Sequence, residues 1–234
     1  MLTPPWPTRI ACSRCGAEME GVVVDSINAE RFPELRAAVL DRSLHHLRCA
    51  QCGTRHALDK ELLYVDFARA QWVTVFPVEE LPRFAECEET ARRAFAHAFV
   101  DTAPGFVRAT AARFAVRVTF GLEGLREKLV CWDAGLDDRV LELLKIDLVA
   151  DRPELVARGV GSFTLDAVAP DGMLLFVPML RVPNADPAVH VVVGMPRAVY
   201  DEAARASDGL RAAHEALWSG PFVSVARYWP YSDA

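Results

Sequence analysis

CSRCG at residues 12–16 and CAQCG at residues 49–53 decide how the N-terminal part of this chain folds. Each stretch places two cysteines on one tight turn, and the glycine that follows permits a sharp backbone turn where a Cβ would clash. Together they supply four sulfur ligands, the number and type that a closed structural Zn²⁺ site uses. The predicted ligands of one structural zinc ion are Cys12, Cys15, Cys49 and Cys52.

The same ligands leave a mononuclear iron open as the alternative metal. Four thiolates fill a tetrahedral site, so the pattern does not indicate catalytic zinc. A redox-active Cys-x-x-Cys needs a βαβ context and a lowered thiol pKa, and two matched motifs argue against it. His45, His46 and His56 lie close to the second motif in sequence. We expect them to be strand or surface residues, with a spare-ligand role as the alternative.

Length and charge limit the class of protein. A chain of 234 residues with 52% apolar content predicts one or two domains with a sizeable core. The net charge is −6: residues 1–60 carry 8 basic and 7 acidic side chains, and the remainder carries 18 and 25. Neither part has the basic excess that phosphate binding usually needs. Nucleic-acid binding therefore stays an alternative that the charge disfavours.

The thiols are expected to be reduced. No apolar run reaches the length of a membrane-spanning helix, and the start, MLTPPWP, lacks a basic stretch followed by an apolar one. We therefore expect no secretory signal, no membrane insertion and a cytoplasmic location, where cysteines bind metals rather than form disulfides. Cys87 and Cys131 stand alone and are expected to be small buried hydrophobic residues.

Residues 1–82 combine short strands with one helix between the two cysteine motifs. Pro33 suits a first helical turn, and Glu34 lies beside the positive helix end. The expected elements are a strand at 22–24, a turn at 25–28, a helix at 32–40, strands at 45–47 and 54–58, and paired strands at 62–65 and 72–76.

Residues 83–234 show helical spacing first and alternation later. Asp137 is expected to cap a helix and Asp138 to complement its positive end, with an acidic site that includes Asp133 as the alternative. Residues 106–120 fit both a helix and a strand. The other expected elements are helices at 91–102, 121–133, 138–148, 197–206 and 210–218, strands at 162–167, 173–177, 190–193 and 222–228, a helix stop at 103–105 and an aromatic tail at 228–231.

The stretches 12–29, 33–35, 49–53 and 62–66 resemble the bacterial CpXC domain family of zinc-ribbon-containing proteins. The likeness is specific over residues 10–80 and weaker to about residue 150, where it rests on the stretches 118–122, 125–128 and 135–139. The family name reflects a proline after the first cysteine, and this chain has Ser13 and Ala50 there. The resemblance implies a zinc ribbon and adds no reaction.

These observations predict an α+β protein, with a zinc ribbon carrying a helical insertion in residues 1–82 and a mixed α/β domain in residues 83–234. No dinucleotide, phosphate-loop or nucleophile motif appears. We therefore expect a non-enzymatic interaction or adaptor protein of the bacterial cytosol, with a protein partner or self-association. The alternatives are an enzyme with an unrecognised site at the domain boundary and a nucleic-acid-binding zinc ribbon.

Overall fold

By its internal contacts the chain falls into two compact units, Met1–Arg126 and Glu127–Ala234. The structure is a computed structural model that describes residues 4–101, 105–180 and 191–228. Within those residues, helices and four separate β-sheets are mixed, which confirms the α+β class. The assignment of domains to 1–82 and 83–234 stays a prediction. The expected helix stop at 103–104, the strand start at His190 and the aromatic tail beyond Tyr228 lie outside the described residues.

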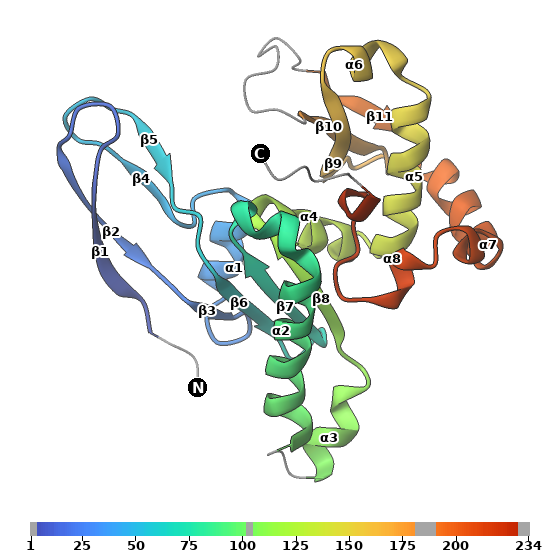
Figure 1. Cartoon of the computed structure of the whole chain (residues 1–234), viewed down its shortest axis with the longest axis horizontal. Coiled ribbons are helices and arrows are strands. Elements are labelled where there is room, and N and C mark those ends of the chain that lie inside the picture. The colour runs from blue at the N-terminus through green and yellow to red at the C-terminus, as the bar shows by residue number, and fades with distance from the viewer. Residues whose placement is uncertain (1–3, 102–104, 181–190, 229–234) are drawn as a thin grey trace. The chain divides into compact units, whose positions relative to one another are not determined.

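Two antiparallel hairpins form one end of the N-terminal unit (Figure 1). Strand β1 (Trp6–Ala11) pairs with β2 (Glu18–Val23), and β4 (His46–Arg48) pairs with β5 (Arg55–Ala57). Both hairpins are closed by turns that carry the cysteine motifs, and β2 contacts β4. The short strands expected around the motifs are therefore confirmed.

A four-stranded sheet forms the rest of this unit's framework. Its order is β3 (Ser26–Asn28), β6 (Leu62–Asp66), β7 (Gln71–Phe76) and β8 (Ala115–Phe120). The β6–β7 hairpin is antiparallel, as expected, and the two outer strands are parallel to their neighbours. Helix α1 (Pro33–Leu40) begins at the proline that the sequence indicated.

The expected turn at residues 25–28 is wrong, because residues 26–28 form strand β3. Ile27 is fully buried and Ser26 is nearly so. The partner of β3 is β6, which lies far along the chain. A local turn signal cannot show such a non-local pairing, and burial of Ile27 in the sheet decided the conformation.

Helical segments pack on one side of this sheet. They are η1 (Val78–Arg83), α2 (Phe84–Ala96), the π-helical η2 (His97–Asp101) and α3 (Gly105–Ala111). Helix α2 contacts β7 and β8 (Figure 1). The ambiguous stretch 106–120 contains both predicted states, because α3 ends at Ala111 and β8 begins at Ala115.

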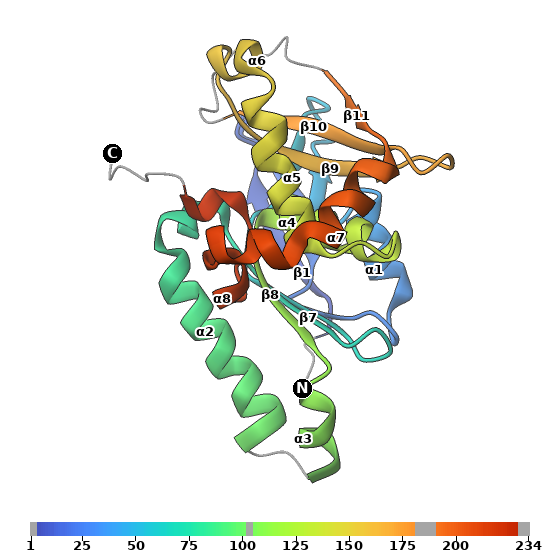
Figure 2. The ribbon, with the colours of Figure 1, turned by 90° about the vertical axis from the view of Figure 1, so that its right-hand side faces the viewer.

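The C-terminal unit combines a three-stranded antiparallel sheet of order β11-β10-β9 with helices. Helix α5 packs against β9 and against α7 (Figure 2). The division between the units falls within α4. The elements are α4 (Gly121–Asp133), α5 (Asp138–Ala150), α6 (Pro153–Ala157), β9 (Val160–Val168), β10 (Leu174–Leu180), β11 (Val193–Met195), α7 (Arg197–Ala213), α8 (Ala216–Ser219) and η3 (Val225–Tyr228).

The predicted helix cap at Asp137 is confirmed. Gly135 has φ +66°, and the Asp137 side chain accepts a 2.8 Å hydrogen bond from the Arg139 amide at the start of α5. The two helices expected at 197–206 and 210–218 are instead one long helix, α7, and the short α8. The expected strand at 222–228 is wrong: it is an irregular segment that ends in η3. Across the described ranges, no helix is long and apolar enough to cross a membrane.

Candidate metal centre

The two cysteine turns have nearly the same backbone geometry. The Gly16 amide donates to the Cys12 carbonyl at 2.9 Å, and the Gly53 amide donates to the Cys49 carbonyl at 2.9 Å. Both glycines have positive φ, +74° and +73°. A side chain at either position would be strained even where space is open. The glycine that ends each motif is therefore what lets the turn close.

The four predicted ligands come together. The Sγ atoms of Cys12, Cys15, Cys49 and Cys52 all lie within 4.8 Å of one another. The closest approaches join the two turns, at 3.5 Å between Cys12 and Cys52 and 3.6 Å between Cys15 and Cys49. Cys12 and Cys49 are buried, whereas Cys15 is exposed. Four sulfurs converging from two turns can hold one metal ion.

The thiols of this group do not ionise alike. Hydrogen bonds from the side chain and the backbone of Thr54 lower the pKa of Cys52 to about 6. At Cys15 a backbone hydrogen bond from Ala17 lowers the pKa, but desolvation and the three neighbouring sulfurs outweigh it and raise the pKa to about 12. A thiol with a raised pKa carries a proton, so metal binding at this group would release protons.

The second motif surrounds the sulfurs with polar side chains. Thr54 Oγ1 lies 3.2 Å from Cys52 Sγ, and Gln51 Oε1 lies 3.8 Å from Cys15 Sγ. His56 Nε2 lies 3.3 Å from Cys12 Sγ. Four sulfurs would suffice for a tetrahedral coordination sphere, so these groups would lie outside it. Around a bound metal they would orient the ligands.

The other two histidines near the second motif do not reach the cysteines. His45 is buried, and its Nε2 accepts a 3.0 Å hydrogen bond from the Val24 amide. The Nδ1 of His46 lies 3.0 Å from the Leu44 carbonyl oxygen. Both histidines therefore hydrogen-bond to nearby backbone groups. Of the three histidines, His56 is the one that lies beside a cysteine sulfur.

The hairpins that carry the turns are held close by a glycine. A Cβ built on Gly21 of β2 would lie 2.0 Å from a methyl carbon of Leu47 in β4. Leu47 is buried, so it has little room to move aside. The absence of a side chain at Gly21 thus allows β2 and β4 to pack this closely.

A second polar cluster lies in the C-terminal unit and was missed by the sequence reasoning. It is a buried ion network in which two lysines meet three carboxylates from α4 and α5. Lys145 Nζ lies 2.7 Å from Oε1 of both Glu127 and Glu142. Lys128 Nζ lies 3.0 Å from Asp138 Oδ2. None of these five side chains is more than 9% exposed. Asp138 therefore pairs with a lysine rather than forming an acidic site with Asp133.

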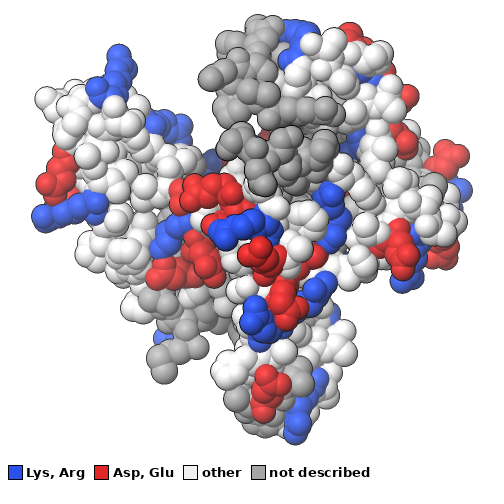
Figure 3. All heavy atoms as spheres, in the orientation of Figure 1, with Lys and Arg blue, Asp and Glu red and all other residues white. Residues whose placement is uncertain are grey.

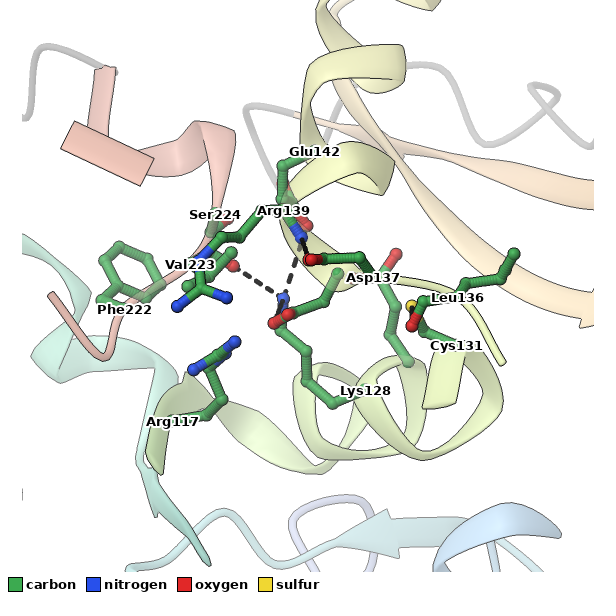
Figure 4. A network of polar contacts seen from close by, with 12 residues as sticks. Arg117, Lys128, Cys131, Leu136, Asp137, Arg139, Glu142, Phe222, Val223 and Ser224 are labelled. Atoms are coloured by element: carbon green, nitrogen blue, oxygen red, sulfur yellow. Dashed lines mark hydrogen bonds and ion pairs between the residues drawn. The ribbon is translucent and has the colours of Figure 1, made fainter. Parts of the chain in front are cut away.

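The ion network also binds the backbone of residues 222–228, the segment that was expected to be a strand. Lys128 donates to the Val223 carbonyl at 2.7 Å (Figure 4), and the Val225 amide donates to Glu142 at 2.8 Å. These backbone groups bond to charged side chains, so they do not form a strand ladder. A charged pair such as Glu142 and Lys145 within the apolar face of α5 is the sequence signal that could have found the network.

One pocket of about 400 Å³ lies beside this network in the C-terminal unit. Its lining is mostly apolar and includes Lys145, His214 and Tyr228. The pKa of Lys145 lies above its usual range: burial lowers it, but the two glutamates outweigh burial. Burial also raises the pKa of Tyr228.

Charge on the surface is mixed. In the face of the N-terminal unit drawn in Figure 3, acidic and basic side chains lie side by side, and no continuous basic stripe crosses the described atoms. On the first hairpin Arg9 pairs with both Glu18 and Glu20, at 3.3 Å and 2.8 Å. Such pairing does not favour a phosphate-binding surface.

Fold and site together define an α+β protein with a four-cysteine centre able to bind a metal. The CpXC protein family matches residues 10–145, which is more than half of the chain. The chain therefore belongs to the CpXC family, as the sequence resemblance indicated. The matched region contains the four cysteines, His56 and all five residues of the buried ion network. Searches of curated proteins and of solved structures found no match.

Proposed function

We propose that the four cysteines hold one Zn²⁺ and that the two hairpins form a zinc ribbon with a helical insertion. The observation that carries this proposal is the convergence of four sulfurs from two matched turns. Zinc suits such a set, because it accepts tetrahedral thiolate ligands and needs no redox partner. The metal would stabilise the N-terminal unit, where the two hairpins are short and offer little core of their own.

The proposed role is structural, and the protein is an interaction or adaptor protein of the bacterial cytosol. A site closed by four protein ligands has no position for a substrate. The outer edge of β1 is unpaired among the described strands, and Trp6 at its start is 40% exposed. An unpaired edge is a surface on which a partner chain or a second copy can add a strand. This edge supports an interaction role.

Metal analysis of the full chain and two cysteine variants tests the zinc part of the proposal. The wild type and Cys87→Ala are expected to carry one zinc per chain, because Cys87 lies buried in α2, away from the site. Cys15→Ala is expected to lose most of its zinc. Iron in place of zinc would correct the metal. Full zinc retention by Cys15→Ala would contradict the ligand set.

A native pull-down of the tagged chain tests the interaction part. We expect a stoichiometric protein partner, or self-association that light scattering detects for the purified protein. Both should weaken in Cys15→Ala and persist in Cys87→Ala if the ribbon presents the contact surface. A monomer that retains no protein would contradict the adaptor role. Nucleic acid in the eluate, seen as a raised 260/280 nm absorbance ratio, would favour the nucleic-acid alternative instead.

A further inference from the structure

Cys12 and Cys49 are the buried cysteines of the centre. Each is 2% exposed, whereas Cys15 is exposed and Cys52 is half-buried. Water can donate hydrogen bonds to an exposed thiolate but has little access to a buried one. A buried anionic sulfur that lacks a donor carries a large desolvation penalty. Cys12 therefore depends on a protein group for its hydrogen bond.

His56 stands where such a donor is needed. Its Nε2 lies 3.3 Å from Cys12 Sγ, within hydrogen-bond range for sulfur. The residue belongs to β5, where it pairs with Leu47 of β4. It is half-buried, whereas its neighbours Arg55 and Ala57 are exposed. Strand alternation thus turns its ring to the inner side of the hairpin, and a paired strand holds it there.

We propose that His56 is a positioning residue of the metal centre whose Nε2–H donates a hydrogen bond to the Cys12 thiolate. The inference rests on the proposed zinc site. Four thiolates would give the zinc centre a surplus of negative charge, and a fixed N–H donor at Cys12 would offset part of it at a buried sulfur. Partners of this kind change metal affinity by about 10- to 100-fold when they are removed.

The proposal predicts an order of effects around the site. His56→Ala should weaken zinc binding by about 10- to 100-fold. Thr54→Val should weaken it less, because Cys52 keeps access to water. His56→Gln should retain most of the affinity, because its amide can place an N–H near the position of Nε2. His46→Ala is the matched control, since its ring lies on the same hairpin and contacts Leu44 instead.

Competition for zinc against a chromophoric chelator, on the folded full chain, measures these affinities. Equal affinities for wild type and His56→Ala would overturn the inference while leaving the zinc site intact. A wild type that binds no zinc would overturn the proposed function itself. Nitrogen NMR of the zinc-loaded wild type gives a readout that needs no variant. The ring proton is expected on Nε2, and a proton on Nδ1 alone would also overturn the inference.

Discussion

At the scale of single residues, the decisive features of this protein are glycines that permit tight turns and polar side chains that are buried. The cysteine spacing and the glycine after each pair predicted the ligand set, because that chemistry is local to five residues. The role of His56 was left among alternatives, since its approach to Cys12 depends on the pairing of β4 with β5. Glu88 of α2 is buried, which the sequence does not show, because the packing of α2 on the sheet could not be inferred from the helix alone.

His45 makes the stability of the N-terminal unit depend on pH. Burial, followed by the positive charge of Lys60, lowers its pKa from 6.5 to about 4, while Asp25 acts in the opposite direction. Below pH 6.5 the unfolded chain binds a proton that the folded chain does not. The contribution of His45 to the unfolding free energy is therefore fully present above pH 6.5 and is lost as the pH falls toward 4.

Urea unfolding at several pH values between 7 and 4 checks this dependence. Wild type is compared with His45→Asn, because asparagine tolerates the positive φ of 56° at this position. Acid release of a bound metal affects both proteins, so the difference between their slopes isolates His45. We expect a shallower loss of stability for the variant. Parallel slopes would show that His45 titrates normally in the folded chain.

At the scale of elements, the sequence indicated most helices and hairpins but not the pairs that form across long distances. Helices α4 and α5 agree with their predicted ranges because caps and periodicity are local signals. Strand β3 was missed because it forms by pairing with β6, which is distant in sequence. The segment before Tyr228 alternates as a strand would, yet its backbone bonds to Lys128 and Glu142. Charged side chains from two helices replaced the expected ladder.

The contact between β2 and β4 predicts that one added methyl group at Gly21 lowers stability and metal affinity. Gly21→Ala would place a Cβ against Leu47 and force the hairpins apart. We expect a loss of about 1–3 kcal/mol in unfolding free energy, as for other overpacked sites, together with weaker metal binding. The double variant Gly21→Ala/Leu47→Ala should recover part of the metal affinity. A chelator competition assay measures it, and an unchanged affinity in Gly21→Ala would contradict the spacing role of this glycine.

The buried ion network predicts a large cost for removing one lysine. Lys145→Met leaves Glu127 and Glu142 buried without their shared cation, and we expect a loss of about 3–5 kcal/mol in unfolding free energy. Lys60→Met is the matched control, because Lys60 also pairs with a carboxylate, that of Asp25, but is 24% exposed. Its loss should stay within about 1 kcal/mol. Urea unfolding measures both, and equal losses would mean that burial adds nothing to the Lys145 pairs.

At the scale of the whole molecule, both units have an apolar core. The core of the C-terminal unit includes Leu141, Phe163 and Phe176, and the sheet of the N-terminal unit has one that includes Val65, Trp72 and Phe99. The apolar cluster of the cysteine hairpins, around Cys12, Met19 and Cys49, is small by comparison. A small cluster needs an added constraint, which the proposed zinc supplies. The cysteines predicted this constraint, but the extent of each unit depends on contacts that no local pattern shows.

Thermal unfolding of the full chain, with bound metal counted before and after chelation, tests the central claim most directly. The account predicts one zinc per chain, an unfolding transition that moves to lower temperature when the zinc is removed, and recovery when zinc is returned. Binding to the folded state alone requires this shift. A chain that carries no metal, or that unfolds at the same temperature with and without it, would contradict a structural metal centre at the four cysteines.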